Sequence, residues 1–483
     1  MIIESPVSIS LVASLAMLCL GGCAGPAVKL DSSEHQALLK ADRTQAEQGA
    51  RQQKISLTLD QALERGVRAN LDARVAAMEI LIQQKEVTLE QLKALPALNA
   101  SVGYVGRSND GSSSSRSIQS GLQSLEPSQS SDRDRRTASL ELNWNLLDVA
   151  LAYTDAKKAG DEARVARARH EKVIQNIQRD VYAAYWRAYA YQATRADTGS
   201  LIADAESQIG KINEAVSKRL LSADAAGDQI AQLSDRVRTL NELEEQLNLS
   251  GIELKSMLAL PLDAELALSS PENYSGNYKS LLNQNLEAQE WEALKNRPEI
   301  REEILQKNLT LRDSKREILT TFPGLELFAG ANYDTNSFLS DSTWLNSSAK
   351  IVQSLISIFT LPTRLEAAKN KEALADARRQ ALVAAVLAQT NIARQRLLSR
   401  EQVLQNSAGS LKAAGSKASL LAHKKATGFA PGATVLQAKL EQQIEVMRNQ
   451  MARADLQDSY AAYMNTLGRR FFRPVNLMAG GAT

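Results

Sequence analysis

The sequence predicts a mainly α-helical protein with a small membrane β portion, built from a helix–hairpin–long helix–turn–helix unit that occurs twice. Three observations lead to this prediction. Two runs of alternating apolar and polar residues, each roughly 9 residues long, match the length of a tilted strand that crosses a bilayer. Helical tracts without proline flank these runs and are too long for a compact globule. The same order of elements then recurs in the second half of the chain.

The composition excludes several classes of protein. The 483 residues carry a formal net charge of +2, so no overall field favours nucleic acid, and we expect no nucleic-acid partner. Aromatic residues make up only 5% of the chain, which is typical of extended helices rather than of a large compact core. Both cysteines, Cys19 and Cys23, lie near the start, which excludes a disulfide framework in the remainder.

The first 22 residues are interpreted as an export signal that ends at a lipidation site. Residues 7–20 form an apolar run too short to span a bilayer, and small residues follow it. The sequence Leu20-Gly21-Gly22-Cys23 resembles the lipobox of bacterial lipoproteins, in which the cysteine becomes the lipidated first residue. An ordinary signal peptide beside a chance cysteine is the alternative. We expect a lipoprotein signal peptide at 1–22 and a lipidated, extended tether at 23–56.

The first unit is expected over residues 57–268. Its initial helical pattern ends at Pro96, because proline removes a backbone donor and clashes with the preceding turn. Alternation then predicts strands at about 97–106 and 137–147, separated by a serine-rich, solvated loop. A second helical tract runs without proline to about residue 221, a length on the order of 100 Å.

The second predicted strand has the clearest alternation in the chain. One parity is apolar and includes Leu140, Leu142 and Trp144. The other parity is polar and includes Ser139, Glu141 and Asn143. Because successive side chains of a strand point to opposite faces, one face of this strand is apolar and the other is polar.

The second unit is expected over residues 290–468, after an inter-repeat linker at 269–289 and before a C-terminal tail at 469–483. Phe322-Pro323 ends its first helical pattern, as Leu95-Pro96 does in the first unit. Strands are predicted at about 324–334 and 345–358, followed by a long helix, a turn and a last helix.

This doubled pattern resembles the outer-membrane efflux protein family, the TolC-like outer membrane factors, over roughly residues 57–468. The resemblance rests on the order and spacing of the elements and on several short motifs. These motifs are the Leu95-Pro96 and Phe322-Pro323 junctions, the turns Trp144-Asn145-Leu146-Leu147-Asp148 and Ser357-Ile358-Phe359, and Gly432-Ala433-Thr434-Val435-Leu436. Thr360 replaces the acidic residue in the second copy, and Leu221-Ser222-Ala223-Asp224 lacks the glycine of the helix-reversal motif.

A membrane sheet of four strands cannot close, and an open edge is not viable in lipid, so two or more chains must share a barrel. The resemblance implies a homotrimer with a twelve-stranded β-barrel, four strands per chain, continuous with a long α-helical periplasmic barrel. It implies that Leu140, Leu142 and Trp144 face lipid and that Ser139, Glu141 and Asn143 line the pore. Candidates for an interfacial aromatic girdle are Tyr104, Trp144, Tyr333 and Trp344, with lone surface aromatics as the alternative.

The resemblance also implies a function and partners. The chain would be an outer-membrane exit duct of a tripartite efflux or type I secretion system, lipid-anchored in the outer membrane. Its partners would be a periplasmic adaptor protein and an inner-membrane transporter of the RND, ABC or MFS type. The sequence does not identify the cargo.

Two chain reversals, near residues 221–224 and 428–432, lie at the far ends of the long helices. In the family this tip is the constricted entrance and the docking surface of the adaptor. Gly428 and Gly432 allow a positive φ at the second reversal, and Pro431 fixes one φ between them. The candidates for the tip or gate are Arg219, Asp224, Lys424, Lys425, Gly428 and Gly432, with solvated helix ends as the alternative.

The sequence offers no chemistry for an enzyme. His35, His170 and His423 lack the spacing of metal ligands, and no nucleotide-binding or nucleophile motif is present, so we expect neither a metal nor a cofactor. The tyrosine and tryptophan side chains near residue 186 are expected to pack between helices. The rival hypothesis is a lipid-anchored periplasmic coiled coil without a pore, which explains the helices but not the duplicated hairpins.

Lipidation of Cys23 predicts that globomycin, which blocks the lipoprotein signal peptidase, leaves the precursor uncleaved. Mass spectrometry of the mature protein should find acyl chains on Cys23, because the lipobox cysteine is modified before cleavage. Normal processing of a Cys23→Ser variant in the presence of globomycin would contradict the prediction.

Overall fold

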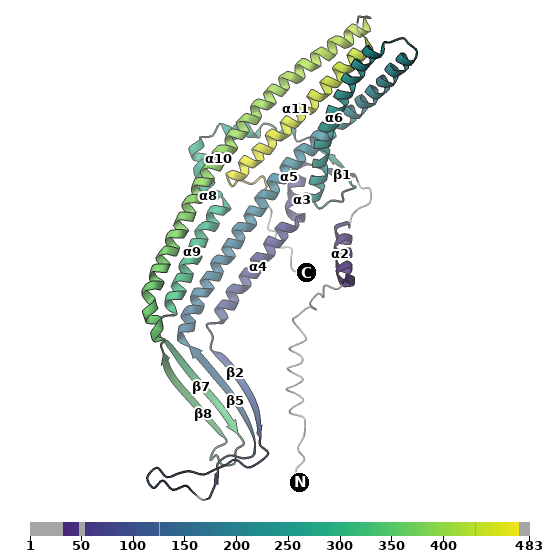
Figure 1. Cartoon of the computed structure of the whole chain (residues 1–483). Coiled ribbons are helices and arrows are strands. Elements are labelled where there is room, and N and C mark those ends of the chain that lie inside the picture. Colours follow the sequence, from purple (N-terminus) through teal and green to yellow (C-terminus); the bar gives the residue numbers. More distant parts are fainter. Residues whose placement is uncertain (1–31, 48–53, 125, 430, 473–483) are drawn as a thin grey trace.

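The computed structural model describes residues 32–47, 54–124, 126–429 and 431–472. Long helices run side by side from a β-sheet at one end of the molecule to two helical turns at the other (Figure 1). The predicted fold class, mainly helical with a small β portion, is confirmed.

The first repeat contains a short strand, two helices, a hairpin, two long helices and a second short strand. In chain order these are β1 (Lys54–Leu57), α3 (Leu59–Ala69), α4 (Leu71–Leu92), β2 (Ala97–Gly106), β5 (Asp134–Asn145), α5 (Leu146–Ser217), α6 (Ala223–Met257) and β6 (Glu265–Leu268). The loop between β2 and β5 carries the two-residue strands β3 (Ser112–Ser113) and β4 (Ser128–Gln129).

Among the described residues, the second repeat has the two helices, the hairpin and the two long helices in the same order, without equivalents of β1 and β6. These are α8 (Leu286–Asn296), α9 (Pro298–Leu319), β7 (Gly324–Asp334), β8 (Thr343–Val352), α10 (Leu355–Ala426) and α11 (Gly432–Thr466).

The helix lengths show how closely the two repeats correspond. Helices α3 and α8 both have 11 residues, and α4 and α9 both have 22. Helices α5 and α10 both have 72 residues, and α6 and α11 both have 35. A position in one repeat therefore has a structural equivalent in the other.

The four long strands form one antiparallel sheet in the order β2-β5-β7-β8. Strands β2 and β7 occupy the residues predicted for them. Strand β5 ends at Asn145, two residues before the predicted boundary, because the Asn145 side chain accepts a hydrogen bond from the Leu147 amide and caps α5.

Strand β8 ends at Val352, which corrects the boundary predicted at residue 358. Val352 pairs with Gly324, the first residue of β7, and the residue before Gly324 is Pro323, which has no amide hydrogen to extend the ladder. Residues 355–358 instead form the first turn of α10.

Two connecting segments are more ordered than expected. The described part of the tether at 23–56 contains the helix α2 (Ser32–Glu47) and β1, which pairs in parallel with β6. Alanine, leucine, glutamine and glutamate favour this helix. The linker at 269–289 contains the 3₁₀ turn η1 (Glu272–Tyr274) and α7 (Asn277–Leu282), which buries Tyr278 and Leu281 against the core.

The main core surrounds the aromatic cluster of α5. Tyr182, Tyr185 and Trp186 are buried, as their spacing on one helix face predicts. The Tyr185 hydroxyl lies 2.9 Å from the carbonyl oxygen of Leu57 and 2.8 Å from that of Ser269. It thereby holds the two-stranded β1–β6 sheet against the long helix.

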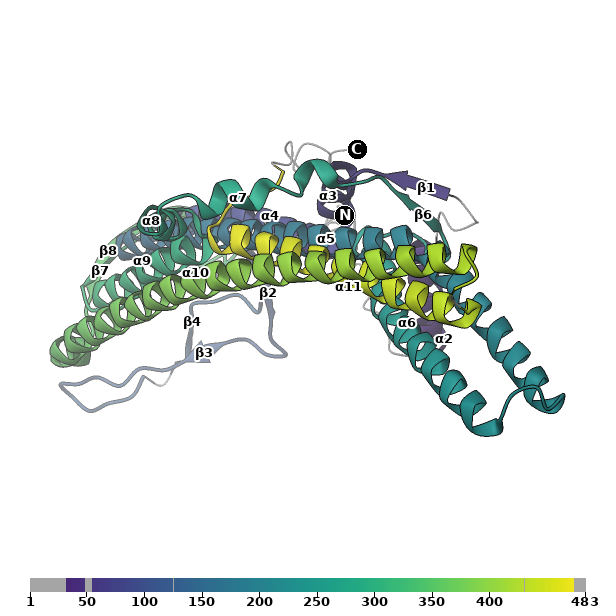
Figure 2. The same cartoon turned by 90° about the horizontal axis from the view of Figure 1, so that it is seen from above.

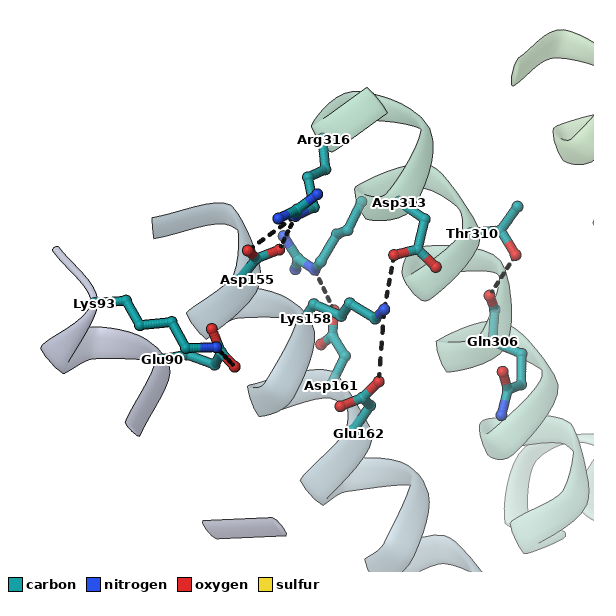
Figure 3. Close-up of polar contacts among 11 residues, drawn as sticks. Glu90, Lys93, Asp155, Lys158, Asp161, Glu162, Gln306, Thr310, Asp313 and Arg316 are labelled. Atoms are coloured by element: carbon teal, nitrogen blue, oxygen red, sulfur yellow. Dashed lines mark hydrogen bonds and ion pairs between the residues drawn. The ribbon is translucent and has the colours of Figure 1, made fainter. Parts of the chain in front are cut away.

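Ion pairs join α5 of the first repeat to α9 of the second. Lys158 Nζ lies 2.8 Å from Asp313 Oδ1, and Arg316 Nε lies 2.9 Å from Asp155 Oδ1 (Figure 3). Exposed pairs of this kind contribute only about 0.2–1 kcal/mol each.

The buried residue among the ion pairs between α5 and α9 is Asp161, whose side chain is 1% exposed. Its Oδ2 accepts a hydrogen bond from Arg312 Nε at 2.5 Å, and its Oδ1 accepts one from Arg164 at 2.9 Å. Removing one partner of a buried pair leaves an uncompensated charge, at a cost of about 3–5 kcal/mol. This cluster therefore fixes the position of one repeat against the other.

Candidate functional site

The register of the sheet separates its side chains into an apolar and a polar face. One row across the four strands is apolar and consists of Ala100, Leu140, Ala331 and Leu345. The adjacent row points to the opposite face and consists of Ser101, Ser139, Asn332 and Trp344. The structure thus places Leu140, Leu142 and Trp144 on one face and Ser139, Glu141 and Asn143 on the other.

Hydrogen bonds connect the side chains of the polar face. The Ser101 and Ser139 hydroxyls lie 2.8 Å apart, and the Ser139 hydroxyl donates to Glu141 Oε1 at 3.2 Å. Two further contacts join β7 to β8, from Asn332 Nδ2 to Asn346 Oδ1 at 2.8 Å and from Lys350 Nζ to Glu326 Oε2 at 3.3 Å.

The apolar face remains uncovered in the single chain. Val102 is 81% exposed, Leu140 48% and Leu345 85%. A contiguous exposed apolar surface of this kind marks an interaction surface for a membrane or a protein.

Aromatic side chains lie at both ends of the apolar face. Trp144, at the helical end, donates its indole N–H to the Ala94 carbonyl at 3.1 Å. Tyr104, at the loop end, donates its hydroxyl to Asp134 at 2.8 Å. Eight residues of β5 separate the two levels, roughly 27 Å along the strand. The prediction that Trp344 belongs to the aromatic girdle is wrong, because Trp344 pairs with Asn332 and lies on the polar face.

The outer strands of the sheet present open edges. No strand pairs with the outer edge of β2 or of β8 among the residues that the structure describes. Every residue of β8 is exposed, whereas the inner strands β5 and β7 are half-buried or buried at many positions.

The first chain reversal is built around a left-handed arginine. Arg219 has a φ of +57°, and its amide donates to the Val216 carbonyl at 2.9 Å. The Leu220 amide donates to the Ala215 carbonyl at 2.9 Å, which completes a Schellman motif at the end of α5. Glycine usually occupies this position, so the sequence offered no signal for the motif.

The second reversal has the same motif with glycine at the left-handed position. Gly428 has a φ of +81°, its amide donates to the Lys425 carbonyl at 3.0 Å, and the Phe429 amide donates to the Lys424 carbonyl at 2.7 Å. Arg219 and Gly428 are equivalent, because each follows a 72-residue helix by the same two positions.

Gly432 does not take the positive φ expected for it. It is the first residue of α11, and Pro431 before it has a φ of −66° and occupies the N-cap. One left-handed residue is enough to reverse the chain here, so the second glycine is helical. A side chain added at Gly432 would meet Lys425, whose Nζ lies 3.6 Å from an ideal Cβ.

The structure brings both reversals to the end of the molecule opposite the sheet (Figure 1). Figure 2 shows that the α5–α6 and α10–α11 turns diverge from one another within one chain. The charged candidates Arg219, Asp224, Lys424 and Lys425 are all exposed, and none has a charged partner within the described ranges.

Cys23 lies outside the residues that the structure describes, and with it the predicted signal peptide. His170 is half-buried on α5, and burial lowers its pKa, with a further lowering from Arg470. Over the described residues, no cluster of acidic, histidine or cysteine side chains has the arrangement of a metal site. None of the described helices combines the length and the apolar character that crossing a bilayer requires.

Contacts between the two outer loops were not foreseen from the sequence. The Asp132 amide donates to Asn336 Oδ1 at 2.9 Å, and the Ser337 hydroxyl donates to Asp132 at 2.8 Å. These residues lie in two different hairpins, more than 200 positions apart, and no local pattern marks them. They join the long serine-rich loop to the short loop between β7 and β8.

No family model and no curated protein sequence matches the chain. Solved structures do share its fold. The MtrE outer membrane channel of Neisseria gonorrhoeae, in its open state, is 14% identical with a TM-score of 0.63, over 85% of this chain and 89% of that one. The CmeC outer membrane channel of Campylobacter jejuni is 10% identical with a TM-score of 0.63, over 85% of both chains. VceC, an outer membrane protein of Vibrio cholerae, is 14% identical with a TM-score of 0.61, over 86% and 97%.

The two faces of β5 predict opposite labelling in lipid. In proteoliposomes, a Ser139→Cys variant should react with a membrane-impermeant maleimide, because its side chain lies on the polar face of the sheet, which we expect to be in contact with water. A Leu140→Cys variant should resist this reagent, and a fluorophore placed there should be quenched by brominated lipid. The unsubstituted protein serves as the control for labelling of its own cysteines, Cys19 and Cys23. Equal labelling at both positions would contradict this assignment of the faces.

Proposed function

We propose that this chain, which has the fold of outer-membrane channels, is a TolC-like outer membrane factor and forms one third of an exit duct. The duct would serve a tripartite efflux or type I secretion system. The observation that carries the proposal is the sheet with one apolar face, one polar face and two open edges. In lipid every backbone polar group needs a partner, so a further chain must cover each edge. Three copies supply twelve strands, above the minimum of eight for bacterial barrels.

The internal duplication supports pairing of β8 with β2 of a second copy. Strands β5 and β8 both precede the 72-residue helices, and β2 and β7 both follow the 22-residue helices. The β5–β7 pair within the chain is therefore the equivalent of a β8–β2 pair between copies. In the β5–β7 pair, Leu142 lies opposite Ala329. In the β8–β2 pair between copies, the equivalent of Leu142 is Ile351 and the equivalent of Ala329 is Val102. This register aligns apolar residues with apolar residues, so both faces continue around the barrel.

The exposed surface of α4 supports the same arrangement for the helices. Ile82 is 59% exposed and Leu89 is 51% exposed. They hold the same positions in α4 as Leu309 and Arg316 hold in α9, where Leu309 is buried and Arg316 pairs with α5. Since α10 is the equivalent of α5, α10 of a second copy is the partner that covers α4.

The proposed orientation assigns roles to both parts of the molecule. The apolar face with Leu140, Leu142 and Trp144 faces lipid, and Ser139, Glu141 and Asn143 line the pore. The helices extend into the periplasm, and acyl chains on Cys23 add an anchor in the outer membrane. The tip of the helices forms the entrance and contacts the adaptor, through the residues Arg219, Asp224, Lys424, Lys425, Gly428 and Gly432.

The duct itself is passive. The sequence contains no phosphate-binding loop, so energy for transport comes from an inner-membrane transporter of the RND, ABC or MFS type. A periplasmic adaptor joins this transporter to the helical tip. The chain has no catalytic role in this scheme.

A lipid-anchored periplasmic coiled coil is the competing function. It accounts for the paired helices α5–α6 and α10–α11. A coiled coil does not explain a sheet whose apolar face is exposed and whose edges are unpaired. In a soluble protein both features would promote aggregation. The sheet therefore favours the duct.

The proposed register predicts a specific crosslink between copies. In detergent-extracted protein, a Val102→Cys/Ile351→Cys double variant should form disulfides on oxidation and run as covalent dimers and trimers. Directly opposed residues of antiparallel strands have Cβ atoms about 4.5–5.5 Å apart, which is close enough for disulfide formation. Non-reducing electrophoresis measures the products.

The matched control moves one cysteine by two residues along β8, in a Val102→Cys/Ala349→Cys variant, which places diagonal neighbours roughly 7–8 Å apart. It should crosslink far less, and each single variant should give no ladder. Products larger than three chains, or no covalent trimer from the matched pair, would refute a closed ring of three copies in this register.

A further inference from the structure

The two helical turns at the tip differ in charge although they are equivalent in structure. Residues 402–440, around the α10–α11 turn, contain five lysines and no aspartate or glutamate. The equivalent stretch of the first repeat, residues 193–231, contains six acidic and four basic side chains. Because the helices around both turns have the same lengths and reverse through the same motif, the fold does not impose this difference.

Three lysines lie closest to the second turn, namely Lys424, Lys425 and Lys439, and we call them the basic tip. All three are exposed, and none has a carboxylate partner among the described residues. At the first turn acidic side chains outnumber basic ones: Lys218 Nζ lies 2.5 Å from Glu214 Oε1, and Arg219 is followed by Asp224 and Asp228.

Stabilisation of helix ends explains only part of the basic tip. Lys424 and Lys425 lie in the last turn of α10, where cations complement the negative end of the helix dipole. The same rule favours acidic residues in the first turn of α11, yet that turn has none, whereas Asp224 lies in the first turn of α6. The helix dipole therefore explains the two lysines but not the missing carboxylates.

We propose that the basic tip makes the entrance of the duct selective for anions, so that the solutes it favours carry net negative charge. This inference rests on the proposed function, in which three copies place each lysine around the entrance three times. Rings of lysine or arginine select anions in other pores, because a narrow water path between like charges concentrates counter-ions.

Most charges on the polar face of the sheet are paired, and the sheet lies at the end of the molecule opposite the tip. On the polar face of the sheet, Lys350 pairs with Glu326 and Arg135 Nη1 lies 3.4 Å from Asp334, whereas Glu141 has no cationic partner among the described residues. At 0.1 M salt the field of an exposed charge decays over about 10 Å, so the narrowest part of the path governs selectivity. In the proposed duct that part is the tip.

Planar lipid bilayers with the full-length protein test the inference. Under a tenfold KCl gradient, the sign of the reversal potential reports whether chloride or potassium permeates more readily. For wild-type channels, the reversal potential should have the sign that indicates a higher permeability for chloride than for potassium. A Lys424→Gln/Lys425→Gln variant should move the potential towards zero, and a Lys424→Glu/Lys425→Glu variant should reverse its sign.

The control is a Lys279→Glu/Lys295→Glu variant, which changes the net charge equally at exposed positions of α7 and α8, far from the tip. It should keep the wild-type reversal potential. A wild-type current selective for potassium, or one that the tip substitutions leave unchanged, would overturn anion selection while leaving the duct intact. The absence of any current from assembled trimers would overturn the duct as well.

Discussion

The open edges of the four-stranded sheet are the constraint on which the rest of this structure depends. Within the described part of the chain, strands β2 and β8 each present a row of unpaired backbone groups beside a face of exposed apolar side chains. In water the unpaired backbone groups can form hydrogen bonds with solvent, but the apolar face is unfavourably exposed. In lipid the apolar face is favourably solvated, but the unpaired backbone groups have no hydrogen-bond partners. The proposed closed ring of copies in a membrane satisfies both requirements, and in this proposal assembly and membrane insertion are linked.

The internal duplication provides the means of closing that ring. Within the chain, β5 joins β7 and α5 joins α9, and the buried Asp161 with Arg312 fixes this junction. In the proposed ring, the junction between copies repeats the same geometry with β8, β2, α10 and α4. One chain therefore contains a template for its own assembly. The two junctions differ in chemistry, since the apolar Leu89 of α4 holds the position of Arg316, which forms an ion pair from α9.

Much of this architecture could be predicted from local patterns. Pro96 and Pro323 mark where strands begin, and the alternation after them, weaker in β2, placed β2 and β7 at the observed residues. The end of β8 was missed, because it depends on where its partner β7 starts, which is not a local property. The left-handed conformation of Arg219 was also missed. A non-glycine residue is strained in this conformation, and only the packing of the long helices on both sides, which is not a local property, stabilises it. Trp344 was assigned to the wrong face, because poor alternation in β8 hides the register that pairing with Asn332 reveals.

The central claim is that the closed assembly is an exit duct, and export from living cells tests it most directly. Two bacterial strains that differ only in this gene, and that lack any substitute duct, are compared for retention and release of a panel of pump substrates. The account predicts that loss of the gene stops release of at least one class of substrate into the medium. It also predicts that the wild-type gene restores release, whereas a variant with Ile351→Pro in the edge strand β8 does not. Unchanged release without the gene would contradict it.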